Sequence, residues 1–254
     1  MARLGLIQFD ILWENAAGNA ARVRDLVRQA IQTMDAADAS FDVLLLPELW
    51  SCGFTMNHEA HKSFDIGFQT MQELARELDC AVMGGLPHKV EGGQENRCYL
   101  VTPDDSRHYA KLKTFNYAGE HLKYRPGSEA MRWEVAGLQI SPYVCYDLRF
   151  PELVRPMMPE TTMVTYVANW PSARVHHWRS LLVARAIENL CYVVGVNRIG
   201  SDGAGREYVG SSMVVAPNGD VLLDCGEGQG LFAVDIDPGE VARTREKWPF
   251  LADM

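Results

Sequence analysis

Hydrophobic residues in the first part of the chain follow two different spacings. A short apolar run over Leu4–Phe9 predicts a strand. Apolar side chains then recur at intervals of three and four residues, as on one face of a helix, at Val23, Leu26, Val27, Ala30, Ile31 and Met34. The run Val43–Leu46 is apolar at every position, which favours a strand buried on both faces. Pro47 ends that run, so Glu48 lies at the end of a buried strand.

The alternation of strand and helix continues down the chain. A helical spacing of apolar residues over Phe68–Leu78 predicts a second helix. Apolar segments over Cys80–Leu86 and Cys98–Thr102 follow, and Gly92-Gly93 between them suits a flexible loop. These two segments are predicted to be adjacent strands.

The second half repeats this order of elements. Leu138–Val144 predicts a strand that ends at Cys145, and Pro151 suits the first turn of a following helix because its missing N–H costs nothing there. The other predicted elements are a helix over His176–Asn189 and strands over Met163–Ala168, Tyr192–Val196, Met213–Ala216, Val221–Leu223 and Leu231–Ile236. Asn218-Gly219 predicts a hairpin between two of these strands.

This order of elements predicts the fold class. Strands that alternate with helices favour an α/β fold in layers. Because the two halves are alike in element order, we expect two mixed sheets packed face to face with helices on the outer faces, an α-β-β-α sandwich. No linker or low-complexity tract interrupts the chain, so residues 1–254 are expected to form a single domain.

Composition excludes several classes of function. The formal net charge is -9 and 47% of the residues are hydrophobic. Without a basic excess or stripe, a nucleic-acid partner is not expected. No apolar run approaches the roughly 18 residues of a membrane span, so no membrane partner is expected. Asp10 and Glu14 come too early for the apolar core of a signal peptide.

The six cysteines predict free thiols. No two of them form a C-x-x-C pair, the close spacing that is typical of zinc ligands. Adjacent helical residues point about 100° apart, so His176 and His177 make a poor chelating pair. We therefore expect reduced thiols, a cytoplasmic location, no metal and no cofactor. Cys52, Cys80, Cys98, Cys191 and Cys225 are expected to pack as small hydrophobic residues.

Three reactive residues follow strand-like segments. They are Glu48, Lys111 and Cys145. A thiol at a strand-to-helix turn is accessible while its backbone is held rigid, and the next backbone N–H, that of Tyr146, can face a developing oxyanion. This arrangement is typical of a nucleophile.

The segments around these residues resemble the motifs of the nitrilase superfamily of carbon–nitrogen hydrolases. VCYDLRFPEL resembles the cysteine motif, LLLPELW the glutamate motif and HYAKLKTF the lysine motif. Within the superfamily, YVANWPSARVHHW, ARAIEN and NRIGSDG are most similar to bacterial omega-amidases of 2-oxo acids. The resemblance implies the same sandwich fold, a homodimer or larger homo-oligomer, and hydrolysis of a small-molecule amide.

The resemblance also implies catalytic roles. Cys145 would be the nucleophile that forms a thioester, Glu48 the base, and Lys111 the charge that supports thiolate and oxyanion. Glu120 in GEHLKY matches a second glutamate of the family, the alternative being an exposed loop carboxylate. Lys113 stands where the family usually has His. Alignment of the motif favours Lys111, although a strand would place both lysines on one face.

The substrate residues are predicted from position. Asn169 and Trp170 follow a buried strand at the sheet end that carries Cys145, and Phe115 and Tyr146 are expected to line the pocket walls. Arg174 is a candidate partner for a substrate carboxylate, or else a surface arginine. Another nearby pair, Arg149 and Glu152, is expected to form a structural ion pair.

Three functions compete at this point. The first is an amidase of 2-oxoglutaramate or 2-oxosuccinamate. The second is hydrolysis of another small compound, such as deaminated glutathione, a carbamoyl compound or a nitrile, by the same chemistry. The third is a non-catalytic interaction scaffold, which the presence of Glu48, Lys111 and Cys145 disfavours.

Overall fold

Two large β-sheets form the centre of the molecule in the computed structural model, which describes residues 1–35 and 39–253. The first sheet has seven strands in the order β15-β1-β2-β3-β4-β5, with β6 paired to β4. The second has six strands in the order β14-β13-β10-β9-β8-β7. A separate two-stranded sheet joins β11 to β12.

The first half of the chain builds most of the seven-stranded sheet and two helices. Its elements are β1 (Ala2–Gln8), α1 (Ala16–Thr33), β2 (Val43–Leu45), α2 (Phe64–Leu78), β3 (Ala81–Val90), β4 (Gly93–Val101), β5 (Ser106–Ala110) and β6 (Tyr124–Arg125). Strands β1, β2 and β3 are parallel, whereas β4 runs antiparallel to both of its neighbours, β3 and β5.

The second half builds the six-stranded sheet and returns one strand to the first. Its elements are β7 (Trp133–Val135), β8 (Leu138–Val144), α3 (Pro151–Val154), β9 (Met163–Val167), α4 (Val175–Asn189), β10 (Tyr192–Val196), β11 (Ile199–Ser201), β12 (Glu207–Val209), β13 (Met213–Val215), β14 (Val221–Asp224), β15 (Gly230–Ile236) and α5 (Glu240–Lys247). Strand β15 pairs antiparallel with β1.

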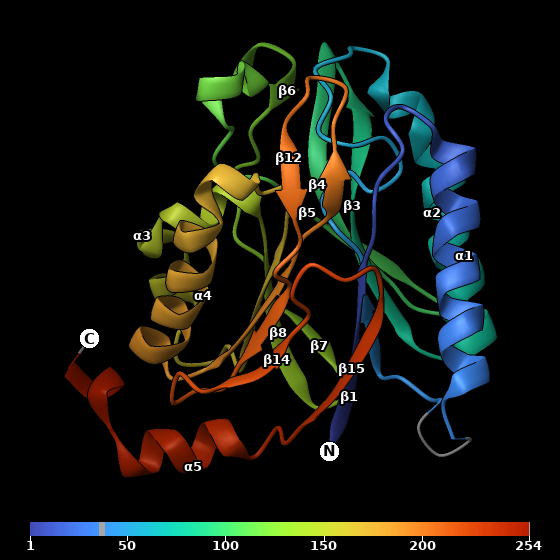
Figure 1. Ribbon diagram of the computed structural model, residues 1–254. Helices are drawn as coiled ribbons and strands as arrows, with labels where there is room; N and C mark the ends of the chain where they lie inside the picture. Colours follow the sequence, from blue (N-terminus) through green and yellow to red (C-terminus); the bar gives the residue numbers. More distant parts are fainter. Residues whose placement is uncertain (36–38, 254) are drawn as a thin grey trace.

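The layers follow the predicted α-β-β-α order (Figure 1). Helices α1 and α2 cover one outer face of the sheets, and α3 and α4 cover the other. The side chains of β2 pack on both faces of the first sheet. Val43 and Leu45 join the core cluster shared with the second sheet, whereas Leu44 packs in the cluster that contains residues of α1 and α2. Because strand side chains alternate between faces, this run is buried on both sides, as its unbroken apolar sequence predicted.

Several element boundaries differ from the prediction. Helix α1 begins at Ala16, where the side chain of Asn15 accepts a hydrogen bond from the Gly18 N–H and caps the first turn. Helix α2 begins at Phe64, earlier than its apolar spacing indicated. The pattern of apolar residues did not predict six elements that are short or largely polar, namely β5, β6, β7, β11, β12 and α5.

Lys111 and Lys113 do not lie on a strand, so the strand geometry that would place both side chains on one face does not apply. Strand β5 ends at Ala110. Beyond it, the Leu112 N–H donates to the Tyr109 hydroxyl and the Lys113 N–H donates to Asp147 Oδ1 at 2.8 Å. Side-chain acceptors take the place of a partner strand here, so the chain leaves the sheet.

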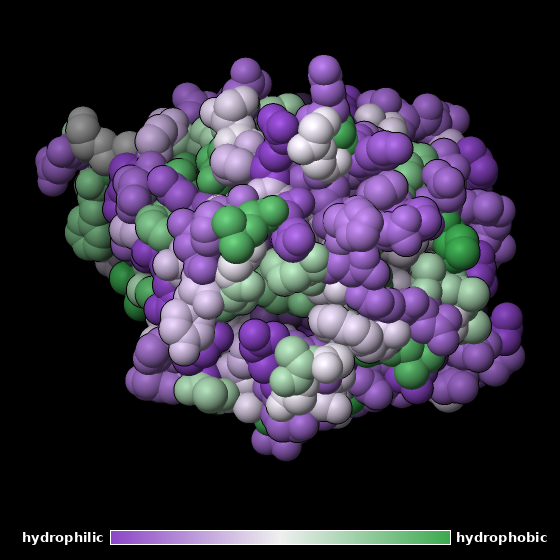
Figure 2. Space-filling model, turned by 90° about the horizontal axis from the view of Figure 1, so that it is seen from above, coloured by the Kyte–Doolittle hydropathy of each residue, from purple (hydrophilic) through white to green (hydrophobic). Residues whose placement is uncertain are grey.

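Helices of the described chain are all too short or too polar to cross a membrane. Seen from above, the molecule presents a mostly hydrophilic face in which hydrophobic side chains form small separate groups (Figure 2).

Candidate active site

Cys145 lies at the point where β8 ends and a short 3-10 helix, Cys145–Arg149, begins. Its φ of 46° is in the left-handed region, which non-glycine residues rarely adopt and which costs about 1–3 kcal/mol. The surrounding structure enforces this turn: Val144 pairs with Val167 on β9, and Asp147 accepts a hydrogen bond from the Val144 N–H at 3.0 Å. The strained turn presents the largely buried thiol to the pocket at the end of β8.

Glu48 follows β2 by three residues and is completely buried. The backbone carrying it stays attached to β3, because the Gly85 N–H donates to the Pro47 carbonyl and the Trp50 N–H to the Gly85 carbonyl. A Cβ atom on Gly85 would lie 2.6 Å from the Glu48 Cα, so only glycine permits this close approach.

Lys111 follows the last residue of β5 and is also buried. Its Nζ donates to Glu48 Oε1 at 2.9 Å and to both oxygens of Glu120, at 3.0 and 2.9 Å. Lys113, the alternative left open by the sequence, directs its Nζ over the Phe150 ring, 5.2 Å from the centroid. The structure therefore places Lys111, and not Lys113, between the two carboxylates.

Glu120 begins a 3-10 turn, Glu120–Leu122, and is fully buried rather than an exposed loop carboxylate. Besides Lys111, its carboxylate accepts a hydrogen bond from the Phe115 N–H at 2.5 Å. The Glu120 side chain thus links Lys111 to the segment that contains Phe115, a residue of the pocket wall.

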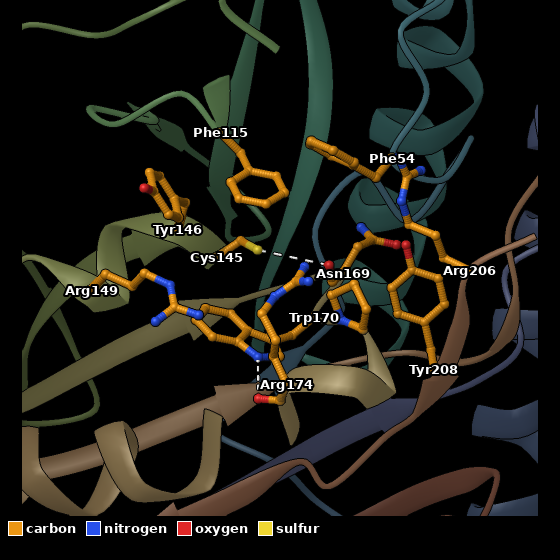
Figure 3. A pocket seen from close by; sticks show the side chains of 11 residues that line it. Phe54, Phe115, Cys145, Tyr146, Arg149, Asn169, Trp170, Arg174, Arg206 and Tyr208 are labelled. Carbon is orange, nitrogen blue, oxygen red and sulfur yellow. Dashed lines mark hydrogen bonds between the residues drawn. The ribbon is translucent and has the colours of Figure 1, made fainter. Parts of the chain in front are cut away.

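Asn169 joins the thiol to the carboxylate through its backbone. Cys145 Sγ donates to the Asn169 carbonyl oxygen at 3.8 Å, a contact drawn in Figure 3. The Asn169 N–H donates to Glu48 Oε2 at 2.8 Å, and the Asn169 side chain donates to the Glu48 carbonyl. Because β8 and β9 are parallel neighbours, Cys145 and Asn169 follow their ends at one edge of the sheet.

The charges around Cys145 disfavour a standing thiolate. Burial raises the pKa of the Cys145 thiol well above its ordinary value, and the Glu48 carboxylate raises it further. Lys111 lowers that pKa, as predicted, but burial and Glu48 outweigh it. Burial would lower the pKa of Lys111, yet Glu120 and Glu48 together raise it, so the ammonium is retained. The resting site therefore holds a neutral thiol beside a charged cluster.

A pocket opens in front of Cys145, and all five predicted substrate residues line it. Figure 3 shows these side chains around the thiol. The lining consists of Phe54, Phe115, Cys145, Tyr146, Arg149, Asn169, Trp170, Pro171, Arg174, Arg206 and Tyr208. Sequence reasoning missed Phe54, Arg206 and Tyr208, which lie outside the motifs and come to the pocket only through the fold.

The predicted ion pair of Arg149 with Glu152 is wrong. No such pair forms in the described chain; instead the Arg149 guanidinium lies over the Trp170 ring, 4.8 Å from its centroid, and contacts His177 Nδ1 at 3.2 Å. The cause is a change of direction at Phe150, whose φ of -116° and ψ of 86° are not helical. The spacing of three residues therefore does not bring the two side chains onto one helical face.

Arg174 belongs to the pocket rather than to a featureless surface. Its guanidinium lies 5.6 Å from the centroid of the Phe115 ring, and its carbonyl accepts a hydrogen bond from Trp170 Nε1 at 2.7 Å. In Figure 3 the guanidinium groups of Arg174 and Arg149 both point toward the middle of the pocket. Within residues 1–35 and 39–253 neither has a carboxylate partner, so two cationic groups face this cavity.

The remaining cysteines lie apart from this chemistry. All five are buried, unpaired thiols whose pKa burial raises to about 12, namely Cys52, Cys80, Cys98, Cys191 and Cys225. No group of three or more His, Cys, Asp or Glu side chains in the described residues could hold a metal ion.

Comparison with known proteins supports the same family. The carbon-nitrogen hydrolase family model matches residues 3–246. Omega-amidase YafV of Escherichia coli (strain K12) is 35% identical, over 99% of this chain and 96% of the relative. A 2-oxoglutaramate amidase of Bacillus subtilis (strain 168) is 31% identical, over 99% and 96%.

A solved structure shows the same fold. The CN-hydrolase superfamily protein of Xanthomonas campestris, which carries an arsenic adduct in its active site, superposes with a TM-score of 0.91. It is 33% identical, and the match covers 100% of this chain and 97% of that protein. The predicted superfamily and sandwich fold are confirmed. The chain therefore belongs to the carbon-nitrogen hydrolase family and is a hydrolase of carbon–nitrogen bonds other than peptide bonds.

Proposed function

We propose that this enzyme hydrolyses the terminal amide of a small 2-oxo dicarboxylic acid monoamide, with 2-oxoglutaramate or 2-oxosuccinamate as substrate. The observation that carries the proposal is a thiol at the pocket wall, linked through Asn169 to a buried carboxylate, with two guanidinium groups facing the same pocket. The names of the relatives in Escherichia coli and Bacillus subtilis support this substrate class.

In the proposed mechanism Cys145 is the nucleophile and Glu48 the general base. Glu48 accepts the thiol proton as sulfur attacks the amide carbon, which avoids a standing thiolate in a site that disfavours one. Lys111 and the Tyr146 backbone N–H stabilise the oxyanion. Loss of one such donor typically costs about 2.7–4 kcal/mol.

Release of ammonia and hydrolysis of the thioester complete the reaction and regenerate the thiol. Protonated Glu48 gives its proton to the leaving nitrogen, the carbon–nitrogen bond breaks, and ammonia departs from a thioester on Cys145. Water then loses a proton to Glu48 and attacks the thioester carbon. The carbon–sulfur bond breaks, the proton returns to sulfur, and the carboxylic acid product leaves. Glu120 keeps the Lys111 ammonium in place through both steps.

The arginines supply the proposed specificity. A guanidinium group can bind a carboxylate through two parallel hydrogen bonds. Arg174 and Arg149 face the pocket without a carboxylate partner in the described part of the chain, so the substrate carboxylate would complete the site. Phe54, Phe115 and Trp170 enclose the carbon chain between that carboxylate and the amide.

A panel of amides scored by ammonia release tests the proposal. It contains 2-oxoglutaramate, 2-oxosuccinamate, deaminated glutathione, a carbamoyl compound, a nitrile and a neutral aliphatic amide, with Cys145→Ala as the inactive control. We expect the two 2-oxo acid amides to give the highest kcat/KM. If neither is among the best substrates, the proposed substrate class is wrong, and complete inactivity on every compound would favour the scaffold function.

An arginine variant separates recognition from chemistry. Arg174→Gln should raise KM for 2-oxoglutaramate by roughly tenfold or more and change kcat less, because it removes binding made equally in ground and transition states. Arg179→Gln is the matched control: it lies in α4, and its guanidinium already pairs with Asp224. Equal effects of the two variants would contradict a carboxylate site at Arg174.

We further propose a cytoplasmic enzyme that works as a homo-oligomer. Six unpaired cysteines support a reducing compartment, and the family resemblance supports self-association. Light scattering after size-exclusion chromatography tests the assembly, and a monomer at micromolar concentration would contradict it.

A further inference from the structure

Asn96 lies in the middle of β4 and contacts every charged member of the proposed catalytic cluster. Its Nδ2 donates to Glu48 Oε1 at 2.7 Å and to Glu120 Oε1 at 3.1 Å. Its backbone carbonyl accepts a hydrogen bond from the Lys111 N–H at 2.9 Å. The side chain is fully buried. None of the three sequence motifs includes this residue.

The charges of the cluster show what this amide does. Two buried carboxylates flank one ammonium, and Glu48 Oε1 and Glu120 Oε1 both accept hydrogen bonds from Lys111 Nζ. Like charges this close repel each other, so each carboxylate is stabilised by a donor in addition to the shared ammonium. A primary amide offers two N–H groups without adding a charge, so Asn96 provides one donor to each carboxylate.

The other end of the amide has no partner among residues 1–35 and 39–253. Asn96 Oδ1 is a buried oxygen without a hydrogen bond in this part of the chain, and an unmade hydrogen bond in the interior is unfavourable. The reverse orientation would direct this oxygen at two carboxylate oxygens. The residue therefore satisfies the carboxylates at the expense of its own acceptor, which favours a functional role over a purely structural one.

We infer that Asn96 is a positioning residue that donates one N–H to each carboxylate and so holds Glu48 Oε1 and Glu120 Oε1 beside the Lys111 ammonium. Glu48 Oε2 is then left on the side of Asn169. The inference rests on the proposed amidase chemistry, and it explains what fixes the orientation of the base.

Two variants test the role. Asn96→Leu has a similar size and no donor, and it should lower kcat by roughly 10- to 100-fold, the size of a hydrogen bond to a charged group, while KM changes less than about threefold. The acid limb of the pH–kcat/KM profile should move up by about one pH unit. Asn96→Asp adds a third carboxylate and should lose more activity at neutral pH, with partial recovery as the pH falls.

A buried asparagine elsewhere is the control. Asn189 at the end of α4 donates to the Arg185 carbonyl and lies outside the cluster. Asn189→Leu should leave the acid limb where it is, even if the melting temperature falls. An Asn96→Leu enzyme with a wild-type acid limb, or with kcat within about threefold of wild type, would overturn the inference. If Asn96→Leu does not fold, the near-isosteric Asn96→Asp decides instead, and kcat within about threefold of wild type at neutral pH would overturn the inference.

A substrate-free measurement separates this inference from the proposed function. Iodoacetamide alkylation of Cys145 is followed across pH in wild type and Asn96→Leu. In the variant Glu48 is less firmly held as the base that accepts the thiol proton, so the alkylation rate constant at neutral pH should fall. An unchanged rate constant contradicts the role of Asn96, whereas a wild type inactive on every amide contradicts the proposed function alone.

Discussion

Among single residues, the accessibility of its thiol distinguishes Cys145 from the other five cysteines as much as the charged groups near it do. It is 9% exposed and lines the pocket, whereas the others are at most 6% exposed. We therefore expect iodoacetamide to modify Cys145 first, at a rate that increases with pH because the pKa of this thiol is raised. Peptide mass mapping gives the site. Earlier modification of Cys225 or Cys80 would contradict this order.

Asp147 is a second residue whose ionisation has a measurable consequence. It is completely buried, and burial raises its pKa from 3.8 to about 6 although the Lys111 charge and the Val144 and Lys113 N–H donors oppose that rise. Between pH 3.8 and about 6 the folded protein holds a proton here that the unfolded chain has released. This group therefore stabilises the fold at low pH, and that contribution is lost as the pH rises through the window.

The Asp147→Asn variant tests that sign. Because Asn does not titrate, the variant should lack this contribution to the pH dependence of the free energy of unfolding, which amounts to at most about 1.4 kcal/mol per pH unit. Urea unfolding of both proteins between pH 4 and 6 measures it. Parallel pH profiles for the two would show that Asp147 is already ionised throughout.

Prediction from sequence worked best for residues at the ends of apolar runs. Glu48 follows an unbroken apolar run and Cys145 follows a strand-like segment, Leu138–Val144, so the strand pattern placed each of them at a strand end. Arg149 was misjudged because spacing alone cannot show that the backbone turns at Phe150. Asn96 was missed for a related reason: its neighbours Glu48 and Glu120 are distant in sequence.

At the scale of elements, the contact between β3 and the segment after β2 determines where the base lies. Gly85→Ala would place a Cβ 2.6 Å from the Glu48 Cα and the Leu49 N, so the backbone must shift. We expect kcat/KM to fall at least tenfold and stability to fall by about 1–3 kcal/mol.

Gly93→Ala provides a matched control for that variant. Gly93 begins β4, and a Cβ there meets no atom closer than 3.5 Å. The comparison uses kcat/KM on the best amide and the midpoint of urea unfolding. Full activity in Gly85→Ala would mean that the Glu48 backbone tolerates displacement.

Helices and strands were predictable where their side chains are buried against the core in a regular pattern along the chain. Strands β8 and β10 have the predicted bounds because all or nearly all of their side chains are buried. Strand β5 (SRHYA) escaped prediction because it lies at the edge of its sheet and exposes most of its side chains. The β11–β12 hairpin, which carries Tyr208 to the pocket, forms a two-stranded sheet of its own and meets the chain near β1 through an isolated bridge between Ile199 and Asp10.

At the scale of the whole molecule, an acidic protein carries a locally cationic pocket. The net charge is -9, yet Arg149 and Arg174, which have no carboxylate partner among the described residues, line one cavity. An anionic substrate is repelled at long range and attracted at short range. At 0.1 M salt, interactions between exposed charges more than about 10 Å apart are largely screened. Partly buried contacts are screened less.

This arrangement predicts how salt affects substrates of different charge. Raising NaCl from low concentration to about 0.5 M should increase KM for 2-oxoglutaramate several-fold, because chloride competes for the guanidinium groups and their field is screened. KM for a neutral amide should stay nearly constant. Initial rates of ammonia release measure both. The same salt dependence for the two substrates would contradict a carboxylate site in the pocket.

Asn169 has a consequence for how the family can diversify. It offers its main-chain carbonyl to the thiol and its main-chain N–H to the base, and every residue type except proline possesses both groups. Mutation at this position can therefore reshape the pocket wall at the cost of the side-chain bonds to the Glu48 carbonyl and to Glu48 Oε2, while both main-chain bonds remain. Selection for a new amide substrate can therefore change the side chain at this position, while the two backbone groups that contact the nucleophile and the base are retained.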